Sequence, residues 1–207
     1  MLILFMMANL VLLQCSKKTM IRKYYVLEIE APKLEMSLDS LQALPYRFEV
    51  QDMRIAKAYD QTRIALRSAS HEMNYYFYHN WAVRPTVAIA DLVYQTLKAS
   101  GICPYADRGY MLNPDYVITG YIDQLERNEQ QRPVAHVCGS LELRIKETDA
   151  PILNYRFNRE LLLTNPKDMN NFAQAVSIIL FEETQGFLRR VVKELVTETS
   201  GSKEVVP

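Results

Sequence analysis

The sequence predicts a single α+β domain in which a largely antiparallel sheet of about six to seven strands carries two main helices on one face. Segments of alternating apolar and polar residues come in a group of four and then in a group of three. A segment with apolar residues at three- and four-residue steps follows each group. Grouped strands with two such helices are typical of an α+β layer, because each helix must bury its apolar stripe.

The first group of strands comes before the first helix. Residues 24–30 are aromatic and β-branched, and residues 46–51 alternate between apolar and polar side chains. Residues 63–67 and 71–79 are the next two predicted strands, and the second of them is rich in aromatic residues. The period then changes, and residues 84–101 are expected to form a helix with proline in its first turn and glycine at its end.

The second group of strands covers residues 116–125, 134–145 and 153–163. In the middle strand the odd-numbered residues from 137 onward are apolar or glycine and the even-numbered ones are mostly polar, so one face is expected to be buried. A turn-like segment follows, so the last two strands are expected to pair antiparallel. A long helix then begins near residue 168, and Gly186 is expected to mark a slight kink in it.

The N-terminus predicts a lipoprotein leader. Residues 1–13 carry no charge and are too few to span a membrane, which needs about 20, but they fit the apolar core of a secretory signal. Leu12-Leu13-Gln14-Cys15 is similar to the motif at which bacterial lipoprotein signals are cut before a cysteine. Because Gln14 stands where a small residue is usual and no basic residue precedes the core, a packed terminal segment or an unlipidated leader remains an alternative.

These segments give the domain organisation. Residues 1–14 are interpreted as a signal peptide of atypical lipoprotein type, and residues 15–23 as the lipidated cysteine with a polar tether. Residues 24–197 are expected to form the α+β domain, without internal repeat or dividing linker, and residues 198–207 a disordered tail.

Composition and motifs exclude several classes of function. The 24 basic residues balance the 24 acidic ones, so the overall charge gives no electrostatic footprint for nucleic acid or for an anionic membrane surface. None of the six glycines precedes a lysine, which excludes a P-loop ATPase. Ser140 follows Cys138 and Gly139 without any sign of a positioned base, so we expect no enzyme activity and no cofactor.

The histidines and cysteines suggest little metal or redox chemistry. His71 and His79 are eight residues apart on one predicted strand, about 27 Å by strand rise, so they cannot share a metal ion and no metal site is expected. Cys103 and Cys138 remain if Cys15 is lipidated. They are a candidate disulfide for an oxidising compartment, with two free thiols as the alternative.

An aromatic stretch at residues 74–81 holds five aromatic side chains, including the only tryptophan. Strand alternation sends Tyr75 and Phe77 to one face and Tyr76 and Tyr78 to the other. Exposed tyrosine and tryptophan are typical of interaction surfaces, so Tyr76, Tyr78 and Trp81 are the candidate partner-binding residues. The alternative is a strand buried on both faces.

In this stretch the chain resembles the ABC-type transport auxiliary lipoproteins, the PqiC-like family. The resemblance covers nearly the whole chain after Cys15. Its matching elements, in order, are the leader that ends in a cysteine, YYVL at 24–27 as the first strand, YHNWAVRP at 78–85 before the central helix, DYVI at 115–118 and the final helix from Phe172.

The resemblance implies a non-catalytic periplasmic lipoprotein of an ABC/MCE-type system that transports lipids or hydrophobic compounds. Its implied partners are an MCE-domain (MlaD-like) protein, with its permease and ATPase, and outer-membrane lipid through the acyl anchor. Such a protein is expected at the periplasmic face of the outer membrane. A lipid-binding carrier, or an assembly lipoprotein for envelope polysaccharide or lipopolysaccharide export, is the alternative, and a homo-oligomer stays open.

Overall fold

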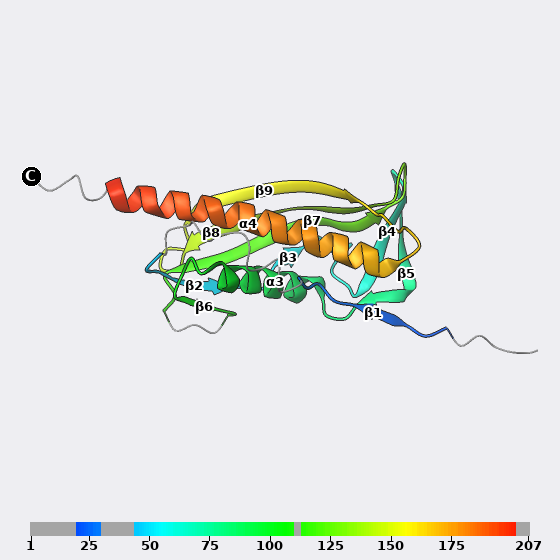
Figure 1. Ribbon diagram of the computed structural model, residues 1–207, viewed down its shortest axis with the longest axis horizontal. Helices are drawn as coiled ribbons and strands as arrows, with labels where there is room; N and C mark the ends of the chain where they lie inside the picture. Colours follow the sequence, from blue (N-terminus) through cyan, green and yellow to red (C-terminus); the bar gives the residue numbers. More distant parts are fainter. Residues whose placement is uncertain (1–19, 30–43, 110–112, 202–207) are drawn as a thin grey trace, which may run out of the picture.

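A computed structural model describes residues 20–29, 44–109 and 113–201. These residues form two helices and one open sheet of nine strands, which confirms the predicted α+β class (Figure 1). The elements, numbered as in Figure 1, are β1 Lys23–Tyr25, β2 Arg47–Val50, β3 Arg54–Ile55, β4 Arg63–Ala69, β5 Glu72–Trp81, α3 Pro85–Ser100, β6 Tyr105–Asp107, β7 Tyr116–Asn128, β8 Val134–Ile145, β9 Pro151–Leu162 and α4 Met169–Gly201.

Strand β7 is the centre of the sheet. One edge of β7 pairs with β8 along its length, antiparallel, and β8 pairs in turn with β9. The other edge pairs, in parallel, with β2, β3 and β4 one after another, through Phe48–Tyr116, Arg54–Tyr121 and Ala65–Glu126. The three long pairings (β4–β5, β7–β8 and β8–β9) are antiparallel, and the short ones are parallel. The sheet is therefore mixed, and its two extra strands, β3 and β6, are too short to show an alternating pattern in sequence.

Both helices pack on the same side of the sheet, as predicted. Helix α4 contacts β8, β9 and α3, and α3 contacts β2, β3 and β6 (Figure 1). The odd-numbered residues of β8 from Ala135 to Leu143 are buried beneath α4, while the even-numbered ones stay partly exposed on the helix-free face. Helix α3 begins at Pro85 and ends at Ser100, and Gly101 caps it with a φ of 65°, the left-handed conformation that glycine tolerates.

Gly186 lets β9 approach α4 closely. A Cβ at this position would lie 2.5 Å from the hydroxyl oxygen of Tyr155 on β9. That hydroxyl donates a hydrogen bond to Glu183 at 2.7 Å, and the Tyr155 ring packs against Phe187. The glycine expected to kink the helix therefore has a packing role. Helix α4 extends to Gly201, so residues 198–201, expected to be disordered, are helical, and residues 202–207 lie outside the described residues.

Gly186→Ala is expected to lower the free energy of unfolding by about 1–3 kcal/mol, because the new methyl group overpacks against a tyrosine held in place by Glu183. In a Tyr155→Phe background, which lacks the hydroxyl, the same change should cost clearly less. Urea unfolding of the unchanged protein, the two single variants and the double variant measures the difference between the two backgrounds. An equal effect of Gly186→Ala in both backgrounds would contradict the packing role.

Candidate functional site

The N-terminal arm, residues 20–29, is fastened to both the sheet and helix α4. Its strand β1 pairs in parallel with the end of β5, with Tyr25 opposite Trp81. The backbone N–H of Ala82 donates to the Tyr25 carbonyl at 2.7 Å. Farther along the arm, the backbone N–H of Glu28 donates to Ser177 Oγ of α4 at 3.2 Å. The arm thus has a defined course over the domain rather than being a loose tether.

A tyrosine–histidine hydrogen bond secures the inner side of the arm. The hydroxyl of Tyr25 lies 2.7 Å from Nδ1 of His79, with the two rings packed together. Burial, and then the charges of Lys23 and Arg127, lower the pKa of His79, so the ring is neutral at neutral pH and Nδ1 can accept this bond. Because the pKa of His79 is lower in the folded protein than in the unfolded chain, neutral His79 contributes to the stability of the fold at neutral pH. This contribution is lost as the pH falls and the ring becomes protonated.

A groove of about 840 Å³ lies between the arm and helix α4. This volume is within the range of sites that bind small molecules, about 300–1,000 Å³. The apolar part of its lining comes mainly from Val26 and Ile29 of the arm and from Ile178 and Phe181 of the helix. Its polar lining consists of Lys23, Glu28, Asn170, Gln174, Ser177, Glu182 and Gln185. The mixture suits a ligand with an apolar body and a polar end.

The aromatic stretch is only partly on the surface. Trp81 is 3% exposed and packs against Phe172 of α4 with the ring centroids 5.8 Å apart, so the expectation that it lies on an exposed surface is wrong. Tyr76 is half-buried beside His79, and Tyr78 is partly exposed. Phe77, which the sequence reasoning did not select, is 61% exposed.

An irregularity in β5 explains why alternation failed here. Between the pairs Arg63–Asn80 and Ala65–Tyr75, β4 advances by two residues and β5 by five. The extra residues of β5 break the two-residue period, as β-bulges do, so side chains two apart no longer share a face. Nothing in the sequence of the stretch marks this irregularity.

The candidate disulfide is absent, because Cys103 and Cys138 are both free. Cys103 follows α3 and packs against the core, and burial raises the pKa of its thiol to about 11. Cys138 lies on the helix-free face of β8, where burial and the charge of Asp123 also raise its thiol pKa. The two side chains are on opposite sides of the sheet, which spacing in sequence could not reveal.

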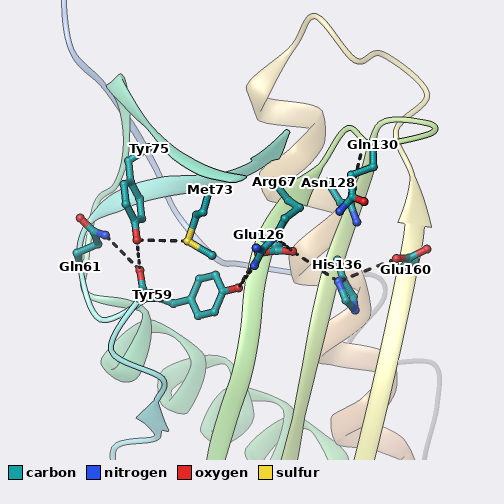
Figure 2. A network of polar contacts seen from close by, with 11 residues as sticks. Tyr59, Gln61, Arg67, Met73, Tyr75, Glu126, Asn128, Gln130, His136 and Glu160 are labelled. Carbon is teal, nitrogen blue, oxygen red and sulfur yellow. Dashed lines mark hydrogen bonds and ion pairs between the residues drawn. The ribbon is translucent and has the colours of Figure 1, made fainter. Parts of the chain in front are cut away.

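A polar network on the helix-free face contains the residue types of an active site. Its hydrogen bonds and ion pairs join neighbouring strands of the sheet. Glu126 of β7 is 2% exposed and accepts hydrogen bonds from Tyr59 at 2.5 Å and from Arg67 Nη2 at 2.9 Å (Figure 2). Burial and the neighbouring Glu126 carboxylate raise the pKa of Tyr59, so its hydroxyl stays protonated. The pair Arg67–Glu126 joins β4 to β7 where the two strands run parallel.

The remaining members of this network and the nearby serine add no catalytic arrangement. His136 Nδ1 lies 4.0 Å from both Glu126 and Glu160, beyond hydrogen-bond reach (Figure 2). Ser140 lines a shallow polar depression of about 590 Å³ together with Tyr121, Asp123 and Arg156, and no histidine lines it. Among the described residues no group of histidine, cysteine, aspartate and glutamate is arranged to hold a metal ion.

The structure says nothing of the proposed lipid anchor itself, since Cys15 and the leader at residues 1–14 lie outside the described residues. Neither described helix has the length and apolar character needed to cross a membrane.

Comparison of the sequence with protein-family models and with curated proteins gives no match. The fold, however, is similar to solved structures. Protein XCC0632 from Xanthomonas campestris, of family DUF330, aligns with a TM-score of 0.70 and 17% identity, over 79% of this chain and 94% of that protein. An uncharacterized protein aligns with a TM-score of 0.64 and 10% identity, over 83% and 99% of the two chains. At these identities the likeness is one of fold.

Trp81→Ala is expected to lower the free energy of unfolding by about 3–5 kcal/mol, because it empties a core position beside Phe172. Tyr78→Ala is its matched control and should cost no more than about 1 kcal/mol, as expected of a partly exposed side chain. Urea denaturation curves of the two variants test this difference. Similar small losses for both would mean that Trp81 is not a core residue.

Proposed function

We propose that this chain is a non-catalytic periplasmic auxiliary lipoprotein of an ABC/MCE-type system that transports lipids or hydrophobic compounds. The observation that supports it most is the fold similarity to a DUF330 protein over 94% of that protein's length. PqiC-like proteins belong to DUF330, the same family that the motifs of this sequence resemble. The fold and the motifs thus support the same proposal from separate observations, although a fold alone can serve several functions.

The position of the arm suits a membrane-anchored module. The arm is described from Met20, five residues after Cys15, a separation of at most about 18 Å for an extended chain. An acylated Cys15 would therefore hold the domain close to the bilayer surface. Because the arm pairs with β5 and is hydrogen-bonded to Ser177 of α4, an anchored arm would restrain the position of the whole domain.

The proposed anchor is tested by the intact mass of the membrane-extracted protein. We expect a chain that begins at Cys15 and carries diacylglyceryl and acyl groups, because several acyl chains bind a membrane stably whereas one binds marginally. The Cys15→Ser variant should keep the leader and carry no lipid. A mature protein that is cut elsewhere, or that begins at Cys15 without lipid, would contradict the anchor.

The proposed docking on an MCE-domain partner is tested at Tyr78, which is partly exposed, whereas Trp81 is buried. Tyr78→Ala should lower the amount of partner that co-purifies with the detergent-extracted protein about tenfold, as expected for an interface tyrosine. Tyr105→Ala, which removes an exposed tyrosine from β6, is the matched control. Equal recovery of the partner with both variants would show that Tyr78 is not in the interface. The absence of an MCE-domain protein from every eluate, that of the unchanged protein included, would contradict the proposed function.

A lipid carrier is the second candidate, favoured by the groove between the arm and α4. Its size and mixed lining suit an acyl chain with a polar head. In this case the protein should co-purify with non-covalently bound lipid, and a charge in the groove, Ile178→Glu, should abolish the association. Lipid extraction and mass spectrometry of the preparation described above would distinguish this cargo from the covalent anchor.

A further inference from the structure

Exposed apolar side chains are concentrated at one place on the domain. Eight large hydrophobic residues are exposed among the described parts of the chain, and six of them lie on the arm, on β5 or just after β5. We call these six the arm surface. They are Met20, Ile21, Tyr24, Val26, Phe77 and Val83. The other two, Tyr105 and Leu162, lie on β6 and β9.

Strand pairing brings the arm surface together. The parallel register of β1 and β5 places Lys23 opposite His79. Ile21 lies two residues before Lys23 and Phe77 two residues before His79, so the same register extended would place Ile21 opposite Phe77. The guanidinium of Arg22 lies over the Phe77 ring, 5.2 Å from its centroid. The hydrogen bond from Ala82 N–H to the Tyr25 carbonyl keeps the neighbouring Val83 beside the arm. Ile21, Phe77 and Val83 therefore lie along the line where the arm pairs with β5, and Tyr24 and Val26 follow on the arm itself.

The arm carries two basic side chains, Arg22 and Lys23, among its exposed apolar residues, and the sequence that precedes the arm is also basic. Between Cys15 and Glu28 the sequence has four basic residues, Lys17, Lys18, Arg22 and Lys23, and no acidic one. The chain as a whole is neutral, so this local excess of charge stands out. Apolar and aromatic side chains mixed with lysine and arginine are typical of segments that lie at the surface of an anionic bilayer.

We propose that the arm surface is a membrane-contact site, with Ile21, Tyr24 and Phe77 in the interfacial layer and Arg22 and Lys23 against anionic phospholipid headgroups. The proposal rests on the proposed function in one respect, because the anchor at Cys15 provides the proximity to the bilayer. A bilayer suits the arm surface better than a protein partner does, since the arm begins five residues after the proposed anchor and carries Arg22 and Lys23 among its apolar residues. The domain is then held in one orientation, with the arm and the exposed Phe77 side chain toward the membrane.

The test uses single labels on the full chain in vesicles of phosphatidylethanolamine and phosphatidylglycerol. Cys103 and Cys138 are first replaced by serine, and then Ile21→Cys or Phe77→Cys is labelled with an environment-sensitive fluorophore. Labels at both sites should shift to the blue and be quenched about twofold by a doxyl lipid whose spin label is shallow, because interfacial side chains lie about 5–10 Å into the headgroup boundary. Labels at Tyr105→Cys and Leu162→Cys are the matched controls and should be unaffected.

Phe77 is the decisive position, because Ile21 is close to the anchor and would approach the bilayer on a tether alone. Quenching at residue 21 without quenching at residue 77 would overturn the proposal. A blue shift at residue 77 without quenching would also overturn it, since it would show that protein covers the patch. Arg22→Gln with Lys23→Gln should reduce quenching at residue 77 to the level found in neutral phosphatidylcholine vesicles, because basic residues bind anionic lipid.

The intact mass of the labelled sample separates this inference from the anchor. Acyl groups on Cys15 without quenching at residue 77 would contradict the membrane contact and leave the anchor intact. Quenching at residue 77 in a preparation that lacks acyl groups would support the contact and contradict the anchor.

Discussion

The structure depends on the pairing of both edges of β7. Its backbone groups would be costly to bury unpaired, and β8 satisfies one edge along the whole strand. No single strand satisfies the other edge. Instead, the chain between residues 47 and 67 runs beside β7 as three short strands in succession. The ion pair between Arg67 and the buried Glu126 lies at the end of these three strands, and Tyr59 supplies a further donor, so the polar network of Figure 2 supports the same pairing.

This arrangement gives the two faces of the sheet different characters. Helices α3 and α4 cover one face with an apolar core, whereas the other face carries polar and charged side chains such as Asn154, Arg156 and Asn158. The arm extends this organisation at one end, where Tyr25 turns inward to His79 and Tyr24 turns outward. The groove and the arm surface thus belong to one region, where the arm meets the long helix.

The sequence was informative where one physical rule acted alone. Alternation identified β8 with its bounds and its buried face, and proline and glycine identified both ends of α3. Prediction from sequence failed where a distant segment of the chain determines the conformation or the burial of a residue. The bulge in β5 depends on β4 and breaks the alternation of the aromatic stretch. Trp81 was placed on the surface as a typical interface residue, but Phe172 of helix α4 packs on it, so it is in the core. Strands β2 to β4 pair in parallel with a strand that follows much later, and local pattern carries no information about that register. The arm was interpreted partly as a polar tether, although Met20 and Ile21 are adjacent apolar residues within it.

The pairing of β7 also has a consequence for how the chain folds. Phe48 pairs with Tyr116, which lies 68 residues later (116 minus 48), and Glu28 is bonded to Ser177, a separation of 149 residues. Such distant contacts make loop closure costly and folding slow. Strands β2, β3 and β4 cannot pair with β7 until β7 has been synthesised, and the arm has no helix to contact until α4 is present. During synthesis the N-terminal half therefore exposes unpaired strand edges until β7 and α4 follow, and such edges are prone to aggregation.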